Sequence, residues 1–322
     1  MKTVTFNPLL RQFENAVKIG ARAKIRLPKW VTAVAILLLA PILAFHGYIA
    51  WTLGRPVIAP LMSNPLEAIG VDYEDVTFPS VNGRSILNGW YIPGDSAQTV
   101  VFSHGYGANR EESWVPMYEL ANALHQLQYN VLMFDYGFVQ PGRVVTGGIQ
   151  ETQELLGAIQ LAKHKGAENV FVWGFSMGAG TALQAALVTK EISGMILDST
   201  YLLDPDTLYM NVKQQIDLPR FPSLALIRFF FPIFNGVSLS QVPTHDVKTT
   251  HYELPIYLIH SKKDSKADYR LIEALYENQP DNGNTKFWLV SNSKHELIYR
   301  AHKKEYMRRA TTFLQSITQG AR

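Results

Sequence analysis

Short apolar and polar segments alternate along most of the chain, and the longest departure from this rhythm lies near the amino terminus. From Trp30 to Trp51 the sequence reads WVTAVAILLLAPILAFHGYIAW, without a formal charge. A helix rises about 1.5 Å per residue, so about 20 residues cross a hydrocarbon core about 30 Å thick. The tryptophans at both ends suit the two interfaces of a bilayer. The pattern predicts a transmembrane anchor over residues 30–52.

Two alternatives to an uncleaved anchor remain for this segment. A cleaved signal peptide has a shorter apolar region followed by a small-residue cleavage site, and no clear A-x-A follows here. A buried helix of a globular domain would show a polar face, which does not recur across 31–44. Pro41 and His46 each leave a polar group that needs a partner in lipid. We favour the anchor.

The rest of the chain alternates between strand-like and helix-like segments after a proline-containing linker over 53–72. The predicted strands are Asp75–Pro79, Ser85–Ile92, Thr99–Ser103, Val131–Asp135, Val170–Gly174, Gly194–Asp198, Pro255–His260 and Lys286–Ser291. The predicted helices are Glu111–Gln126, Ile149–Lys165, Met177–Lys190, Asp268–Asn278 and Ala301–Gln315. Two early strands joined by an Asn-Gly turn, followed by β-α alternation, predict an α/β domain over 73–322. Its sheet should be mostly parallel, with an antiparallel entry and helices on both faces.

One long insertion interrupts this alternation. Residues 201–252 separate two predicted core strands and are rich in aromatic residues and prolines, with the apolar centre FPSLALIRFFFPIFNG at 221–236. The insertion could be a cap over an active site, a membrane-contacting patch or a packed excursion. Its position between core strands favours a cap.

Charge is distributed unevenly along the chain. Residues 1–30 contain seven lysines and arginines and one acid, whereas the remainder has three more acids than bases. The basic cluster precedes the apolar span, so the positive-inside rule predicts a cytoplasmic tail over 1–29 and an extracytoplasmic main domain. A nucleic-acid enzyme would carry its positive charge on the folded domain, so that class is disfavoured. The absence of cysteine excludes disulfides and thiol catalysis.

The strongest chemical motif is the pentapeptide GFSMG at Gly174–Gly178. It follows a predicted apolar strand and precedes a helix rich in small residues, the context that a G-x-S-x-G nucleophile turn requires. A serine in such a sharp turn stands at the amino terminus of a helix, where N–H groups and the helix dipole stabilise negative charge. We therefore predict Ser176 as a nucleophile, with Gly174 and Gly178 supporting the turn.

At these residues the chain resembles the α/β-hydrolase superfamily, and the likeness extends from about residue 73 to the C-terminus. It is most similar to membrane-anchored or secreted serine hydrolases, including depalmitoylase-like proteins and uncharacterised bacterial members. In this family an HG-x turn after an early strand supplies an oxyanion-hole N–H. The resemblance assigns that turn to His104 and Gly105 and the two N–H donors to Tyr106 and Met177. The loop Asp135–Phe138 reads DYGF where many relatives have DYRG, which leaves the pocket geometry open.

The family order of nucleophile, acid and then histidine narrows the choice of the base and the acid. His295 lies in a polar loop after the last predicted strand, whereas His302 falls in a helical stretch. His295 is therefore the predicted base. Asp264 follows the strand Pro255–His260 in HSKKD, with a serine where the family has glycine, and is the predicted acid. Asp198 and Asp268 are the alternatives.

These residues predict a serine hydrolase that cleaves carboxylic esters or thioesters through an acyl-enzyme. The apolar insertion and the anchor favour an acyl or otherwise hydrophobic small-molecule substrate, with the lipid bilayer as the other partner. A serine peptidase on the same triad and a catalytically idle membrane-bound binding protein are the alternatives. The sequence predicts neither a metal site nor a cofactor, and GFSMG lacks the G-K-[ST] ending of a phosphate loop.

Overall fold

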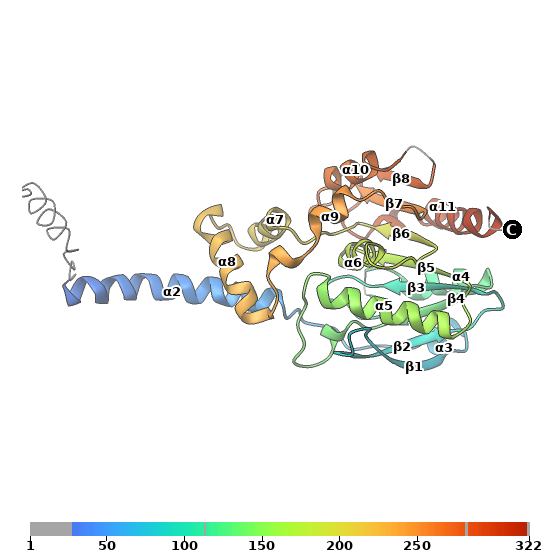
Figure 1. The fold of residues 1–322 in the computed structure, drawn as a ribbon, viewed down its shortest axis with the longest axis horizontal. Helices are drawn as coiled ribbons and strands as arrows, with labels where there is room; N and C mark the ends of the chain where they lie inside the picture. Colours follow the sequence, from blue (N-terminus) through green and yellow to red (C-terminus); the bar gives the residue numbers. More distant parts are fainter. Residues whose placement is uncertain (1–27, 113, 281–282, 321–322) are drawn as a thin grey trace, which may run out of the picture. The chain divides into compact units, whose positions relative to one another are not determined.

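The computed structural model describes residues 28–112, 114–280 and 283–320, and an eight-stranded sheet forms the centre of the domain (Figure 1). The strands are β1 (Glu74–Pro79), β2 (Ile86–Ile92), β3 (Gln98–Ser103), β4 (Asn130–Phe134), β5 (Asn169–Phe175), β6 (Gly194–Asp198), β7 (Ile256–Ser261) and β8 (Thr285–Val290). Every predicted strand is present within one residue of its predicted bounds.

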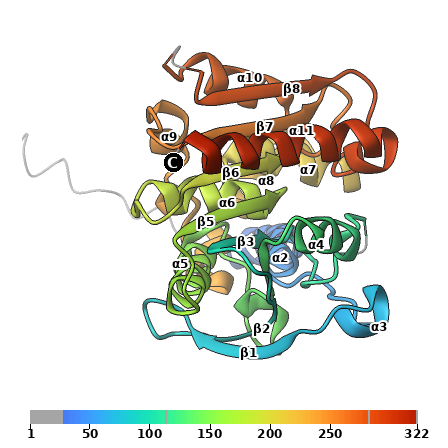
Figure 2. The ribbon, with the colours of Figure 1, turned by 90° about the vertical axis from the view of Figure 1, so that its right-hand side faces the viewer.

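The strand order is β1-β2-β4-β3-β5-β6-β7-β8, which Figure 2 shows stacked from β1 at the lower end to β8 at the upper end. Strand β2 runs antiparallel to both β1 and β4, and the remaining neighbours are parallel. Gly83, with φ of +68°, lies in the turn between β1 and β2. The predicted antiparallel entry into a mostly parallel sheet is confirmed.

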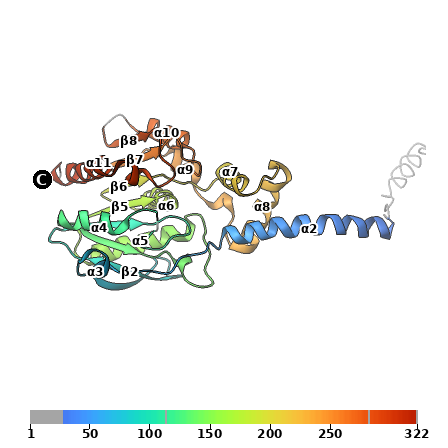
Figure 3. The same ribbon diagram turned by 180° about the vertical axis from the view of Figure 1, so that it is seen from behind.

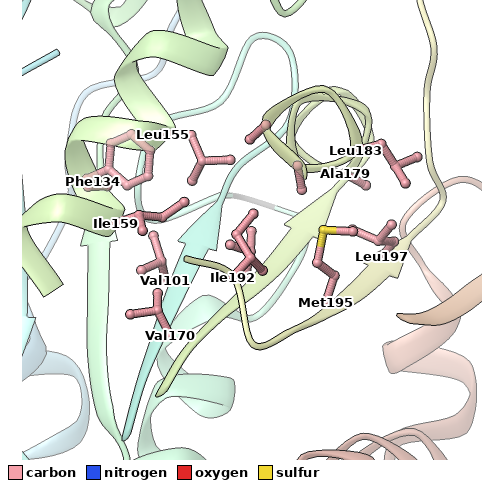
Figure 4. Packing of buried hydrophobic residues seen from close by; sticks show 14 of the residues in the cluster. Val101, Phe134, Leu155, Ile159, Val170, Ala179, Leu183, Ile192, Met195 and Leu197 are labelled. Atoms are coloured by element: carbon pink, nitrogen blue, oxygen red, sulfur yellow. The ribbon is translucent and has the colours of Figure 1, made fainter. Parts of the chain in front are cut away.

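Helices cover both faces of the sheet. The helices that follow α2 (Lys29–Leu53) are α3 (Pro65–Ile69), α4 (Met117–Gln126), α5 (Ile149–His164), α6 (Met177–Ala186), α7 (Pro205–Gln215), α8 (Arg220–Asn235), α9 (Thr244–Thr249), α10 (Tyr269–Glu277) and α11 (Ile298–Gly320), with 3₁₀ turns η1 (Gly137–Val139) and η2 (Leu239–Gln241). Side chains of α5, α6 and α10 share one buried cluster with the strands, and those of α4 and α11 share another. Figure 4 shows the first cluster, in which Leu155 and Ile159 of α5 and Leu183 of α6 lie against strand residues such as Val101 and Leu197.

Three predicted helices differ from the observed ones by several residues at their ends, and one of them is α11, which runs from Ile298 to Gly320 rather than from Ala301 to Gln315. Helix α4 begins at Met117 rather than at Glu111, because Pro116 disfavours helical backbone before it and Glu112 adopts a left-handed φ of +41°. Helix α6 ends at Ala186 rather than at Lys190, where Leu187 and Val188 bond to carbonyls three residues earlier. The predicted linker 53–72 also contains the short helix α3, which Asn64 caps.

The predicted span is helical in the structure. Helix α2 runs from Lys29 to Leu53 with a mean hydropathy of 2.1 in its most apolar window, long and apolar enough to cross a membrane. A helix of this kind near the amino terminus is compatible with an anchor or with a signal sequence. The chain divides into two compact units, of which the first ends at Phe45 and the second begins at His46. The predicted basic tail lies almost wholly outside the described residues.

The insertion 201–252 folds into α7, α8, η2 and α9, and it begins at the carboxyl end of β6. Figures 1 and 3 show α7 and α8 side by side beyond the strand ends. Their apolar residues form a small cluster of their own with Ile49, which lies in the final turns of α2. The Asn235 side chain donates to the carbonyl of Ala50 over 2.8 Å. The insertion therefore has a local core, and part of that core comes from the end of α2.

Candidate active site

Ser176 stands on a sharp turn between β5 and α6. Its backbone has φ of +49° and ψ of −116°, a strained conformation for a residue with a side chain. A Cβ atom on Gly174 would lie 2.6 Å from the Cα of Ala179, and one on Gly178 would lie 2.0 Å from the carbonyl oxygen of Ser103. Both glycines are required because the backbone passes too close for any side chain. The turn predicted from GFSMG is present.

The structure brings Ser176, His295 and Asp264 together. The His295 Nε2 atom lies 2.7 Å from Ser176 Oγ, and its Nδ1 atom lies 2.6 Å from Asp264 Oδ2. The carboxylate accepts the Nδ1–H, which leaves Nε2 as the acceptor for the serine hydroxyl proton. The geometry therefore suits a base that removes a proton from Ser176.

Asp264 is fixed by its own loop after β7. Its Oδ1 atom accepts the backbone N–H groups of Lys266 and Ala267 at 2.8 and 2.9 Å. Burial by itself raises the pKa of Asp264, but the hydrogen bond and the charge of His295 outweigh burial and hold that pKa below its usual value. Asp264 is therefore ionised at neutral pH and able to stabilise a protonated imidazole.

The two alternative acids have other partners. Asp198, at the end of β6, accepts hydrogen bonds from the hydroxyls of Tyr306 at 2.8 Å and Ser199 at 2.9 Å. Burial raises the pKa of Asp198 to about 6, and those hydrogen bonds only partly offset the burial. Asp268 caps α10 by accepting the N–H of Arg270. His302 packs edge-on against Trp288.

The turn after β3 lies directly against the serine. A Cβ atom on Gly105 would lie 3.4 Å from that of Ser176. His104 is fully buried, and burial lowers its pKa to about 4. The neutral ring accepts the N–H of Tyr136 at Nε2, and its Nδ1 lies 3.0 Å from the Gly105 carbonyl. His104 thus fixes the turn without carrying charge.

The residues predicted to form the oxyanion hole, Met177 and Tyr106, directly follow Ser176 and Gly105 in the chain. Met177 is the first residue of α6, so its N–H has no acceptor within the helix. Tyr106 follows Gly105 in the turn after β3. The Gly105 N–H donates to the Glu112 carboxyl at 2.8 Å. The phenol of Tyr106 donates to the carbonyl of Leu53 at 3.0 Å.

Several residues that shape the site were missed by sequence reasoning. Glu112 and Glu296 are buried beside Gly105, although glutamates are usually exposed. The DYGF loop is held by Arg110, whose guanidinium lies 2.7 Å from Asp135, whereas Arg143 is exposed. Ser261, in the place of a family glycine, donates to the carbonyl of Ser293 at 2.6 Å and so joins the acid loop to the histidine loop. Only the adjacency of Glu296 to His295 was visible in the sequence.

Comparisons with known proteins agree with this architecture. A family model described as the α/β-hydrolase fold matches residues 98–232. An esterase of Pyrococcus furiosus is 24% identical, with a TM-score of 0.66 and coverage of 82% of this chain and 98% of its own. An α/β hydrolase from a Penicillium species is 17% identical, with a TM-score of 0.59 and coverage of 76% and 99%. No curated protein matches the chain.

An esterase of Exiguobacterium antarcticum is also similar in structure, at 18% identity and a TM-score of 0.52, with coverage of 75% of this chain and 100% of its own. The chain therefore has the predicted α/β-hydrolase fold, and residues 98–232 match the model of that family. Two of these structural neighbours are esterases, and at 24% and 18% identity the likeness shows the shared fold. Among the described residues, no cluster of three or more histidine, aspartate or glutamate side chains is suited to a metal ion.

Proposed function

We propose that this protein is a serine hydrolase that cleaves carboxylic esters or thioesters of acyl substrates. The observation that carries the proposal is the continuous hydrogen-bonded chain from Ser176 through His295 to Asp264, with contacts of 2.7 and 2.6 Å. Such a chain, on a strained turn at a helix amino terminus, activates a hydroxyl for attack on a carbonyl carbon.

The reaction proceeds in two acyl-transfer steps. His295 takes the Ser176 proton as the oxygen attacks, and the N–H groups of Tyr106 and Met177 bind the developing oxyanion. The protonated imidazole, stabilised by Asp264, then gives its proton to the leaving alcohol or thiol. Water, deprotonated by His295, attacks the acyl-enzyme and releases the acid, which restores the serine.

Two contacts support an acyl substrate that reaches the site from a membrane. Tyr106, in the proposed oxyanion turn, bonds to the carbonyl of Leu53, the last residue of α2. Pro56, just beyond α2, lies 3.4 Å from the position of a Cβ atom on Gly107 in the same turn. The carboxyl end of the apolar helix therefore adjoins the proposed catalytic centre. If α2 is an anchor, the centre works close to the bilayer surface.

The insertion offers a second apolar element at this end of α2. Phe229 and Phe234 of α8 are 62% and 37% exposed, and Trp51 of α2 is 42% exposed. Arg55 links the two helices, because its guanidinium lies over the Trp51 ring and donates to the Phe234 carbonyl. Aromatic and arginine side chains together suit the interface of a membrane. We assign the insertion as a cap that contacts lipid.

We infer that α2 stays in the membrane with the amino terminus cytoplasmic and the hydrolase domain extracytoplasmic. The basic excess in residues 1–30 supports this orientation, since it precedes the span. Proteases added to intact cells or spheroplasts should then cleave the main domain, and cleavage restricted to inverted vesicles would reverse the topology. A mature protein that begins beyond residue 45 would instead identify a signal peptide.

A fluorophosphonate probe tests the proposed nucleophile in the full-length, detergent-solubilised protein. The probe should label the native protein and the control Ser193→Ala, which removes a hydroxyl from the residue before β6, but not Ser176→Ala. Native protein that folds and yet resists the probe would favour an idle, membrane-bound binding protein. Aryl esters and thioesters of increasing chain length, compared with aminoacyl amides, then define the bond. A preference for amides would identify a peptidase.

A further inference from the structure

Two buried glutamates flank the turn that faces the nucleophile. Glu112 follows the HGYG turn and Glu296 directly follows His295, and each is 3% exposed. Both have left-handed backbone, with φ of +41° at Glu112 and +57° at Glu296. Such φ values are uncommon outside glycine and cost stability, so the fold holds both carboxyls in place at an energetic expense.

Gly105 lies between these two carboxyls. Its N–H donates to Glu112 Oε2 over 2.8 Å. A Cβ atom on Gly105 would lie 2.8 Å from Glu296 Oε1 and 3.3 Å from Glu112 Oε2, so the two oxygens are at most 6.1 Å apart. The same position is 3.4 Å from the Cβ of Ser176. The pair therefore contacts the backbone that leads into the proposed oxyanion hole.

Each glutamate has one oxygen without a partner. Within the part of the chain that the structure describes, the Oε1 atoms of Glu112 and Glu296 are buried and accept no hydrogen bond from another group. Two ionised carboxylates buried on one glycine repel each other, and a proton on one of them removes this repulsion and provides a hydroxyl donor. One proton held by the pair would therefore reduce the number of unpartnered oxygens.

The surrounding charges favour retention of that proton. Burial raises the pKa of Glu112 to about 8, against the opposing effect of its bond to Gly105. Burial and then the charge of Glu112 raise the pKa of Glu296 well above its usual value. Three carboxyls face Glu296 and raise its pKa, namely those of Glu112, Asp198 and Asp264. The Trp114 side chain donates a hydrogen bond to Glu296 and lowers its pKa. The Nε2 atom of His295 lies 4.0 Å from Glu296 Oε2.

We propose that Glu112 and Glu296 share one proton and act as positioning residues that hold the Gly105 turn against the His295 loop. The proposal rests on the serine hydrolase function proposed above. While the proton is present, Glu112 fixes the Gly105 N–H and Glu296 adjoins the same glycine from the histidine loop. When the proton leaves at alkaline pH, the two carboxylates repel, the turn shifts, and the oxyanion loses part of its stabilisation.

The test is the pH dependence of kcat for an aryl ester, measured with the full-length protein between pH 7 and 10. In Glu296→Gln the amide donates to Glu112 at every pH and so replaces the proton. We expect kcat of the native enzyme to fall about 10-fold over this range, less than the roughly 10²–10³-fold that loss of a whole oxyanion donor causes, and KM to change little. Glu296→Gln should remove most of this fall, and Glu296→Ala should lower kcat throughout.

Matched controls separate this inference from the proposed function. Glu191→Gln alters an exposed glutamate and should keep the native pH profile. Thermal unfolding shows whether Glu296→Gln is folded, and Glu112→Gln provides the reciprocal variant if it is not. The shared-proton proposal is overturned if kcat falls equally at alkaline pH in the native enzyme and in both glutamine variants. It is also overturned if kcat of the native enzyme does not fall. Failure of the fluorophosphonate probe to label Ser176 at every pH overturns the hydrolase function itself.

Discussion

His295 Nδ1 lies 2.6 Å from Asp264 Oδ2, and the other nitrogen of the same ring, Nε2, lies 2.7 Å from Ser176 Oγ. Asp198 belongs to the neighbouring strand, but its carboxyl is occupied by two hydroxyl donors. A histidine can be oriented by only one carboxylate at Nδ1. The geometry therefore separates a carboxylate that orients the base from one that supports the core.

Replacement of Asp264 by asparagine should lower kcat about 10³–10⁴-fold, because the amide stabilises neither the correct tautomer nor the protonated ring. The matched variant Asp198→Asn should retain most of the activity and lose stability, since it disturbs the buried bonds to Tyr306 and Ser199. Ester hydrolysis and thermal unfolding of both proteins check this division. A larger loss of kcat in Asp198→Asn would reassign the acid.

Much of the architecture could be predicted from sequence, because strand periodicity and the strand-to-helix context of GFSMG are local properties. The order of nucleophile, acid and histidine was enough to select Ser176, Asp264 and His295 for comparison with the geometry. The buried glutamates were not accessible in this way. Their burial depends on long-range packing, and the left-handed φ of a non-glycine residue leaves no trace in composition or periodicity.

The ends of the helices could also not be predicted from the local sequence pattern. The helix predicted to begin at Glu111 begins at Met117, because the structure uses residues 109–112 for a turn that places Glu112 on Gly105. Residues that were predicted to be helical therefore form part of the candidate site instead. The difference between prediction and structure falls where the proposed chemistry needs a particular side chain.

Gly178→Ala should abolish labelling of Ser176 and destabilise the fold. The new methyl carbon would lie 2.0 Å from the Ser103 carbonyl oxygen, and backbone on both sides must move, at a cost of about 3 kcal/mol or more. Gly166→Ala is the control, because φ there is +96° but no atom lies within 4 Å of the added carbon. It should cost about 1–2 kcal/mol through backbone strain alone and leave labelling intact. Equal effects in denaturant unfolding would contradict the close-approach argument.

Stability should fall as pH rises from about 4.5 toward 7, in part through Glu154. Burial raises the pKa of this carboxyl to about 7, above the value in the unfolded chain, so the folded state binds the extra proton. The contribution of Glu154 to the free energy of unfolding is complete below the pKa of this group in the unfolded chain. It is lost as the pH rises through the pKa of the folded state, by an amount on the order of 3 kcal/mol. Glu154→Gln should reduce this slope, and the exposed control Glu253→Gln should not. Denaturant midpoints at pH 5 and 8 measure it.

The ion pair behind the Gly105 turn should contribute more than those on the surface. The Arg110 guanidinium lies 2.7 Å from Asp135 and stacks over the Trp90 ring, and it is 6% exposed. Arg110→Met would leave the carboxylate buried without a cation, which typically costs about 3–5 kcal/mol. Arg220→Met breaks an arginine–aspartate pair on the exposed surface of the insertion and should leave the melting temperature unchanged, because water replaces the partner.

Since Asp135 also accepts the Arg110 N–H, the turn that precedes Glu112 should loosen as well, and fluorophosphonate labelling of Ser176 should slow in Arg110→Met. Equal melting temperatures in the two variants would mean that the buried pair does not stabilise the site.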